Sequence, residues 1–248
     1  MTTFSPSSPS LDLRSVPALS AREELIREVQ SGLRFRPRSL SPWILYDQQG
    51  SCLFEAITTV PEYYPTRTER TILSRHADEI LATACRQSAG FLRVLELGAG
   101  TASKTSLLLT AATHRHREVV YMPIDVSRDA LDAACERIGS SLPDVQLDPV
   151  VLNYVTSPPE LERFDGPTLA LYLGSSIGNF LPEEARTILR NLKSQLRDDD
   201  ALLLGTDLVK AESTLVAAYD DAEGVTAAFN LNILERLNRE LDANFDRA

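Results

Sequence analysis

Residues 91–106 decide the fold and read Phe-Leu-Arg-Val-Leu-Glu-Leu-Gly-Ala-Gly-Thr-Ala-Ser-Lys-Thr-Ser. The apolar run over 92–97 stops at Gly98, which is typical of a buried strand in a parallel sheet. Gly98 and Gly100 lack a Cβ, so they permit a tight turn and a close backbone approach to a ligand. A helix is expected over 101–110, and its first turn would offer unpaired N–H groups. Strand, turn and helix together predict half of a nucleotide-type site at the carboxyl edge of a sheet.

The carboxylate before the turn indicates what kind of ligand binds there. Glu96 is expected to face the cleft and to hold a cationic group. A dinucleotide fingerprint would place its third glycine at position 103, which is Ser103, so that fingerprint is incomplete. A ligand with a positive centre and little phosphate fits better, and S-adenosylmethionine has a sulfonium and an ammonium group. The alternative is an ordinary strand-turn-helix that binds nothing.

Composition narrows the class of protein. The chain has 248 residues, 43% of them hydrophobic, and a net charge of −10, which argues against nucleic acid and against an anionic membrane surface. No apolar run approaches the roughly 18 residues of a membrane span. Cys52, Cys85 and Cys135 are scattered and odd in number, so we expect buried thiols in a reducing cytoplasm instead of disulfide bridges or metal ligands. His114 and His116 share a polar loop, so no metal site is expected.

Beyond the glycine turn the chain alternates strands and helices. Strands are expected at 119–124, 145–152, 168–173 and 201–206, and helices at 127–138, 182–196, 211–220 and 223–241. This order predicts a doubly wound parallel α/β sheet of the Rossmann type with right-handed crossovers. Asp125 ends one strand and is expected to bind ribose hydroxyls, while Ser127 caps the next helix. Asn153 and Tyr154 end another strand, next to where adenine would lie, and Gly174 follows a fourth.

The N-terminal third of the chain differs in composition from the alternating strands and helices that follow it. Residues 1–17 are rich in Ser, Thr and Pro and are expected to form a disordered tail. Residues 43–70 combine a tryptophan and three tyrosines in a loop and short helix, which suits the wall of a small-molecule pocket. An equally good interpretation is that this segment is a lid anchored by its tyrosines, which packs on the protein and has no role in a pocket. The expected division is a substrate-lining segment at 18–90, a cofactor-binding core at 91–209 and a helical substrate lobe at 210–248.

Four motifs resemble those of the histidine-specific, S-adenosylmethionine-dependent methyltransferases of ergothioneine biosynthesis, a family that includes fungal ergot-pathway amine methyltransferases. They are LYDQQGSCLFE (45–55), PEYYPTRTE (61–69), ELGAGTASKT (96–105) and LGSSIGNF (173–180). The resemblance runs from about residue 20 to the end. It implies a class I methyltransferase sheet with an added helical lobe that binds the amino-acid substrate.

The resemblance also implies roles for individual residues. Gly98, Lys104 and Asp125 would hold the cofactor, with Asn153 and Tyr154 near its base.

On the substrate side, Tyr46 and Tyr63 would line the amino-acid pocket, and Asn179 would hold the substrate amine and carboxylate. Tyr219 would bind the carboxylate. Tyr46, Tyr63 and Asn179 are the expected catalytic residues, and either tyrosine or water would accept the amine proton. The implied reaction is Nα-methylation of histidine up to hercynine. Two alternatives remain, namely a methyltransferase for another amine, such as a tryptophan derivative, and a catalytically weak cofactor-binding subunit.

Two departures from the family bear on these expectations. Asn153 stands where the family tends to place an acidic residue. The family also continues past Ala248 with two further strands and a Glu/Ser pair for the substrate imidazole. We therefore expect an uncovered apolar edge at strand 201–206, self-association or marginal stability, and low activity toward histidine, unless the terminal helix covers that edge.

Overall fold

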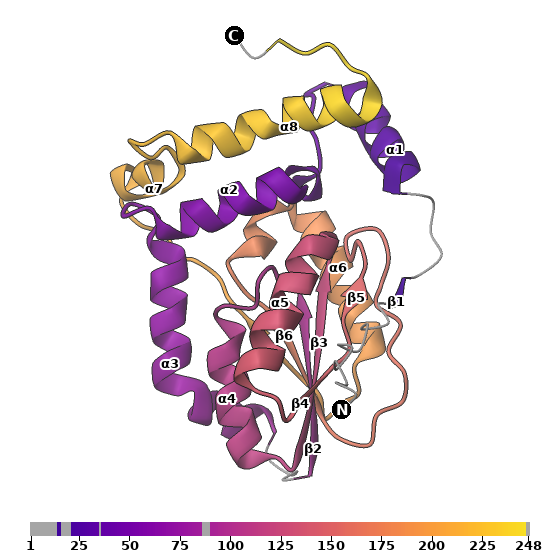
Figure 1. Cartoon of the computed structure of the whole chain (residues 1–248), viewed down its shortest axis with the longest axis vertical. Coiled ribbons are helices and arrows are strands. Elements are labelled where there is room, and N and C mark those ends of the chain that lie inside the picture. The colour runs from indigo at the N-terminus through magenta and orange to yellow at the C-terminus, as the bar shows by residue number, and fades with distance from the viewer. Residues whose placement is uncertain (1–13, 16–20, 35, 86–89, 247–248) are drawn as a thin grey trace, which may run out of the picture.

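The computed structural model describes residues 14–15, 21–34, 36–85 and 90–246. Within them, seven strands form one parallel sheet in the order β1-β5-β3-β2-β6-β7, with β4 also paired to β3 (Figure 1). The strands are β1 (Arg14–Ser15), β2 (Phe91–Leu97), β3 (Glu118–Asp125), β4 (Val145–Leu147), β5 (Val150–Val151), β6 (Thr168–Tyr172) and β7 (Ala201–Leu204). The predicted doubly wound parallel sheet is confirmed.

Helices cover both faces of this sheet and its carboxyl edge. They are α1 (Ala21–Arg34), α2 (Gln48–Thr59), α3 (Tyr64–Ala84), α4 (Thr105–Arg115), α5 (Arg128–Ser141), α6 (Pro182–Gln195), α7 (Glu212–Tyr219) and α8 (Val225–Leu241), with the 3₁₀ turns η1 (Pro42–Leu45) and η2 (Ser176–Asn179). Side chains of α3, α4 and α5 form the core on one face, and α6 packs on the other. No helix among the described residues is long and apolar enough to cross a membrane.

The central strand β2 shows why the sheet is buried on both sides. Leu92 and Val94 point into the core beneath α4, whereas Leu95 and Leu97 point into the core beneath α6. All four are almost completely buried. Because side chains alternate along a strand, the apolar residues of β2 fill both faces of the sheet at once.

The helix after the glycine turn begins later than predicted, at Thr105 instead of Thr101. Gly98, Gly100 and Ala102 have φ angles of 67°, 52° and 53°. A right-handed helix cannot include residues in this left-handed region, so the turn extends until the backbone leaves it.

The strand predicted at 145–152 is two short strands, β4 and β5, with Asp148 and Pro149 between them. Proline has no N–H to donate to a ladder, which interrupts regular pairing there. The strand predicted to run to residue 206 ends at Leu204.

The predicted N-terminal tail is also partly wrong, because Arg14–Ser15 pairs in parallel with Val150–Val151. The remainder of residues 1–17 lies outside the described residues.

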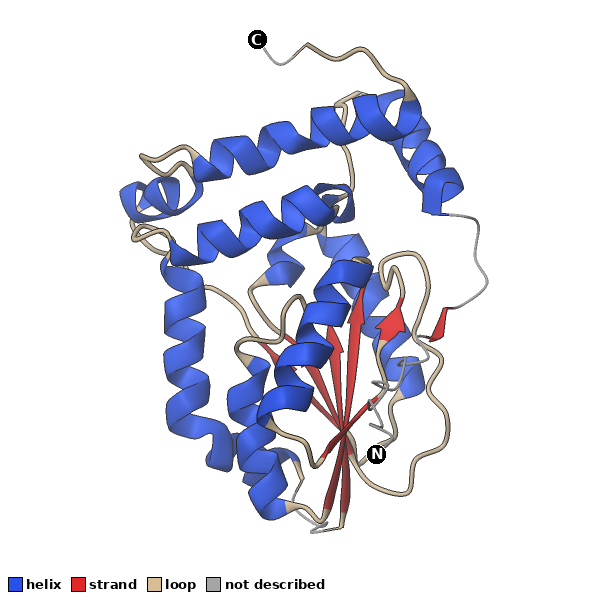
Figure 2. Ribbon diagram, viewed as in Figure 1, coloured by secondary structure: helices blue, strands red, loops and turns tan. Residues whose placement is uncertain are grey.

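A layer of helices lies across the carboxyl edge of the sheet. The strand arrows in Figure 2 point toward α2, and α8 lies alongside α2 above them. Because α8 packs on α2 and η1, Leu202 and Leu204 of β7 remain 40% and 37% exposed. The terminal helix therefore leaves the β7 edge uncovered.

Candidate active site

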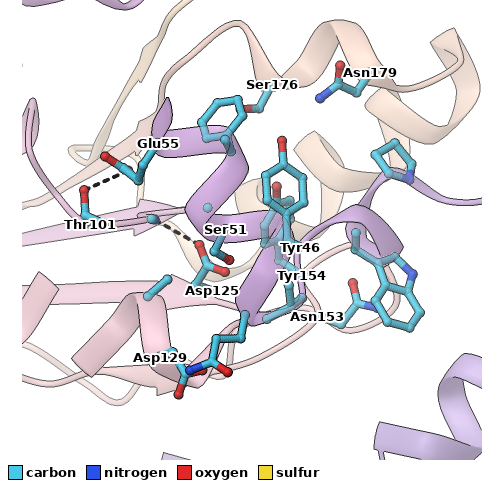
Figure 3. Close-up of a pocket in the computed structure, with 18 of the residues that line it drawn as sticks. Tyr46, Ser51, Glu55, Thr101, Asp125, Asp129, Asn153, Tyr154, Ser176 and Asn179 are labelled. Atoms are coloured by element: carbon cyan, nitrogen blue, oxygen red, sulfur yellow. Dashed lines mark hydrogen bonds between the residues drawn. The ribbon is translucent and has the colours of Figure 1, made fainter. Parts of the chain in front are cut away.

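A cavity of about 480 Å³ lies at the carboxyl ends of β2 and β3, beneath α2 (Figure 3). The glycine turn forms part of its wall. A Cβ on Gly98 would meet the Tyr154 hydroxyl at 3.2 Å, whereas a Cβ on Gly100 would meet nothing within 4 Å. The turn therefore presents bare backbone to an open space, which suits a ligand that approaches the main chain closely.

Asp125 lines this cavity from the end of β3. Its Oδ2 accepts a hydrogen bond from Gly100 N at 2.9 Å, and its Oδ1 accepts one from Ser127 N at 2.9 Å. Burial raises the pKa of this carboxyl group above its usual value. Each carboxylate oxygen has a second lone pair, so the group can still accept hydrogen bonds from ribose hydroxyls. The predicted cap is confirmed, because Ser127 Oγ accepts from Ala130 N at 3.3 Å.

Asn153 and Tyr154 line the same cavity beside Trp43. The Tyr154 ring meets Tyr172 edge to face, with ring centroids 5.7 Å apart. The Asn153 amide donates to Glu24 Oε1 at 2.8 Å and accepts from Val155 N at 3.2 Å. Flat aromatic walls with a few fixed polar groups suit a purine ring.

Glu96 does not line the cavity, so its predicted place in the cleft is wrong. It is 3% exposed, and its oxygens accept hydrogen bonds from the Thr105 hydroxyl, at 2.7 and 2.8 Å, and from the Tyr121 hydroxyl. Strand alternation places Glu96 on the same side of β2 as Val94, beneath α4. Burial raises the pKa of this carboxyl group to about 7.

Lys104 and Gly174 lie together, but next to the main cavity instead of in its wall. Lys104 forms an ion pair with Glu69 of α3, and Glu69 Oε1 accepts from Gly174 N at 2.8 Å. Glu69 and Gly174 line a second cavity of about 220 Å³ between α3 and the ends of β6 and β7. Sequence reasoning did not single out Glu69, although it ends the motif at 61–69.

The predicted substrate tyrosines belong to one aromatic cluster, formed by Tyr46, Phe54, Tyr63, Tyr219 and Phe229. Tyr46 lines the cavity and meets Phe54 and Phe229 edge to face at 5.5 and 5.6 Å between centroids. Tyr63 contacts Phe54 at 6.4 Å and Tyr219 at 5.9 Å. Tyr63 and Tyr219 therefore extend the cluster outward from Phe54 and do not line the cavity itself.

The phenol groups of Tyr46 and Tyr63 are poor acids. Burial raises the pKa of both well above the usual value, and Asp125 adds to the effect at Tyr46. Both hydroxyls stay protonated near neutral pH, so they can donate hydrogen bonds but cannot act as strong bases.

Asn179 ends η2 and lines the cavity together with Ser176. Both lie across the cavity from Asp129 in Figure 3. The preceding Ser175 has a left-handed φ of 57°, and its Oγ accepts from Asp207 N at 3.0 Å. This hydrogen bond anchors the turn that presents Asn179.

The sequence model of the family described as "Histidine-specific methyltransferase, SAM-dependent" matches residues 25–248. The chain belongs to this family. It is 44% identical over 227 residues to histidine N-alpha-methyltransferase of Mycolicibacterium smegmatis, covering 92% of this chain and 69% of that protein. It is 44% identical over 222 residues to histidine N-alpha-methyltransferase of Mycobacterium tuberculosis, covering 90% and 67%. Ergothioneine biosynthesis protein 1 of Neurospora crassa is 32% identical over 232 residues, covering 92% of this chain and 26% of that protein.

Membership of the histidine-specific methyltransferase family makes the chain an S-adenosylmethionine-dependent enzyme. The residues of the cavity fit that cofactor. One cavity combines three features that fit it, namely an open glycine turn, a carboxylate at the end of the next strand and an aromatic end with a fixed amide.

The pocket wall expected over 43–70 includes one face of α2, which roofs the cavity, but sequence reasoning did not single out the residues of that face. Gln48, Ser51, Cys52 and Glu55 all line it, and Glu55 Oε1 accepts from the Thr101 hydroxyl at 3.0 Å. Their spacing of three and four residues places them on one side of a helix, a signal that could have identified this face. The expectation of buried thiols is wrong for Cys52, which is exposed, whereas Cys85 is half-buried and Cys135 is buried.

Proposed function

We propose that this chain transfers methyl groups from S-adenosylmethionine to the Nα atom of histidine, up to the trimethylated product hercynine, in ergothioneine biosynthesis. The observation that carries the proposal is that groups suited to a nucleoside and groups suited to an amino acid line the same cavity. Asp125 and Asn153 supply nucleoside-binding groups, and Tyr46 and Asn179 supply neutral polar groups for an amino acid. Identity of 44% to two histidine N-alpha-methyltransferases supports the choice of substrate.

The cofactor would be held by the backbone at Gly98 and Gly100, by Asp125 at the ribose and by Asn153 and Tyr154 at the adenine. When bound, it supplies a methyl group attached to a positively charged sulfur. The chain adds no cation among the residues that line this cavity and are described here. Carboxylates and neutral dipoles therefore surround the region where the sulfonium would lie.

The contribution of the chain to the reaction is mainly orientation. Displacement at a methyl group requires the amine nitrogen to lie in line with the breaking bond. The Asn179 amide has both a donor and an acceptor, so it can hold an amine and a carboxylate without adding charge. Tyr46, with its neighbours Phe54 and Phe229, would present its ring and hydroxyl to the same substrate.

The attacking amine must be neutral, so its proton has to leave before transfer. Of the acceptors considered from the sequence, Tyr46 and Tyr63 remain protonated because their pKa values are raised. We therefore assign proton removal to water and hydrogen-bond donation to Tyr46. The rate should rise with pH as the amine loses its proton, without a loss from phenol ionisation in the neutral range.

Asn179→Asp tests the proposal, because it keeps the size of the side chain but replaces the amide donor with a negative charge. Cofactor affinity should be largely kept, while histidine affinity should fall by at least about tenfold. Calorimetry with S-adenosylhomocysteine and then histidine measures both. Asn230→Asp, an exposed position on α8, is the matched control.

Mass spectrometry of the products from a panel of amines completes the test. Methylated histidine as the main product is the expected result. A preference for a tryptophan derivative or another amino acid would show that histidine is not the main substrate. Equal loss of cofactor and histidine binding in Asn179→Asp would show that Asn179 only supports the fold.

A further inference from the structure

The side chain of Asn153 is held by a residue from a distant part of the chain, Glu24 of α1. Glu24 Oε1 accepts from Asn153 Nδ2 at 2.8 Å and from the Thr156 hydroxyl at 2.9 Å. Asn153 is 9% exposed and lines the cavity, whereas Glu24 is half-buried and contacts Asn153 from outside the cavity lining. On its other side, Asn153 Oδ1 accepts from Val155 N at 3.2 Å. Both ends of the amide therefore have defined partners.

A carboxylate can only accept hydrogen bonds, so the amide must turn its NH₂ group toward Glu24. The carbonyl oxygen is then fixed on the opposite side. It has two lone pairs, and Val155 N uses one of them. The second lone pair is available to a hydrogen-bond donor in the cavity.

This acceptor lies at the aromatic end of the cavity, beside Trp43 and Tyr154. A purine in that place would present its 6-substituent to polar groups of the wall. The 6-amino group of adenine donates hydrogen bonds, whereas the 6-oxo group of hypoxanthine only accepts them. A fixed acceptor therefore favours adenine and leaves hypoxanthine with two opposed lone pairs.

We propose that Glu24 is a positioning residue that makes the cavity select an adenosyl over an inosyl cofactor, by fixing the orientation of the Asn153 amide. The inference rests on the proposed function, because it requires the adenine of the cofactor to lie beside Asn153. It also explains why position 153 carries an amide. Two carboxylates at this distance would repel each other, so Glu24 requires a donor as its partner.

Glu24→Ala tests this role by binding of two ligands that differ only at position 6 of the purine, S-adenosylhomocysteine and S-inosylhomocysteine. The parent protein should prefer the adenosyl ligand. In Glu24→Ala the adenosyl ligand should bind about tenfold more weakly, because the amide loses a hydrogen bond to a charged group that fixes it. The inosyl ligand should bind equally well or better, because the released amide can turn its NH₂ group toward the 6-oxo group.

Glu23→Ala is the matched control, since Glu23 is an exposed carboxylate on the same helix. It should keep the parent's ratio of the two affinities. The inference is overturned if Glu24→Ala leaves the ratio of the two affinities unchanged. This holds whether both ligands bind more weakly to the same degree, which would show only structural support, or neither affinity changes. A parent protein that binds neither ligand would instead contradict the proposed function.

A charge swap tests the same contact even if Glu24→Ala does not fold. Asn153→Asp alone should weaken adenosyl binding about tenfold or more, because two carboxylates then face each other. Adding Glu24→Gln should restore binding to within a few-fold, since the introduced amide can donate to the introduced carboxylate. A double variant that binds no better than Asn153→Asp alone would overturn the inference.

Discussion

Glu96 shows at the scale of one residue how a buried carboxyl group couples protonation to stability. Its pKa is raised to about 7 by burial, against about 4.3 in an unfolded chain. Between these values the folded protein holds a proton that the unfolded chain has lost, so the free energy of unfolding falls as pH rises. Above pH 7 the full cost of the buried charge is present.

Glu96→Gln removes this titration. The variant should be more stable than the parent at pH 8, by up to about 3 kcal/mol, and nearly equal to it at pH 4.5. Urea unfolding at several pH values measures the difference. Glu223→Gln, at an exposed position, should follow the parent. Parallel stability curves for Glu96→Gln and the parent would show that Glu96 is already ionised at low pH.

Gly98 is the residue where the backbone itself contributes to binding. Its φ of 67° strains any other residue, and an added Cβ would meet the Tyr154 hydroxyl at 3.2 Å. Gly98→Val should abolish binding of S-adenosylhomocysteine in a calorimetric titration. Gly139→Ala in α5, where the nearest atom to a new Cβ is 3.7 Å away, should bind normally and be slightly more stable. Tight binding by Gly98→Val would place the cofactor elsewhere.

At the scale of elements, Asp47 joins α2, which roofs the cavity, to α8, which packs on α2. Its Oδ1 accepts from Gly50 N, which caps α2, and from Asn232 Nδ2 of α8, both at 2.7 Å. Its Oδ2 pairs with Arg239 at 2.5 Å. Although burial alone would raise the pKa of Asp47, these hydrogen bonds outweigh it and hold the pKa below its usual value.

Asp47→Ala should lower the free energy of unfolding by about 2–3 kcal/mol and weaken cofactor binding, because α2 carries the roof of the cavity. Thermal melting and calorimetry measure the two effects. The stability that Asp47 contributes is present above the pKa of an unfolded aspartate and is lost in acid, so the parent and the variant should converge as pH falls. Asp144→Ala, at an exposed loop position, is the control. If the variant loses stability but binds the cofactor as tightly as the parent, α2 does not contribute to cofactor binding.

The elements that could be predicted are those whose signal is local. Strands β2, β3 and β6 are apolar runs that end at a glycine or an aspartate, and their carboxyl ends meet at one edge by the rules of parallel sheets. The direction of Glu96 was missed because strand alternation, not proximity to the turn, decides which face it occupies. Residues 43–70 were expected to line a pocket, but the face of α2 that does so was not identified, because it depends on packing against α8, a contact between distant parts of the chain.

At the scale of the whole molecule, the sheet ends in an apolar strand. Among the described residues, β7 pairs only with β6, and Leu202 and Leu204 remain partly exposed. Open backbone groups beside apolar side chains favour pairing with another chain. We predict that this 248-residue chain self-associates at micromolar concentrations, which sedimentation velocity would detect.

A paired substitution locates the contact. Leu202→Lys with Leu204→Lys should shift the protein toward the monomer, because charged side chains disfavour edge-to-edge pairing. Leu208→Lys changes an exposed residue beyond the end of β7 and should leave the association unchanged. A parent that is monomeric at every concentration would contradict the prediction.

The exposure of Cys52 gives the site a built-in chemical reporter. It is the exposed thiol in the wall of the cavity, while burial raises the pKa of Cys85 and that of Cys135, the latter to about 11. Thiolates, not thiols, react with iodoacetamide, so the alkylation of an unmodified protein should fall mainly on Cys52. A cofactor in the cavity would shield it. The alkylation rate of this natural side chain, followed by mass spectrometry, therefore measures how much of the cofactor cavity is occupied. The measurement requires neither a labelled ligand nor a partner enzyme nor turnover.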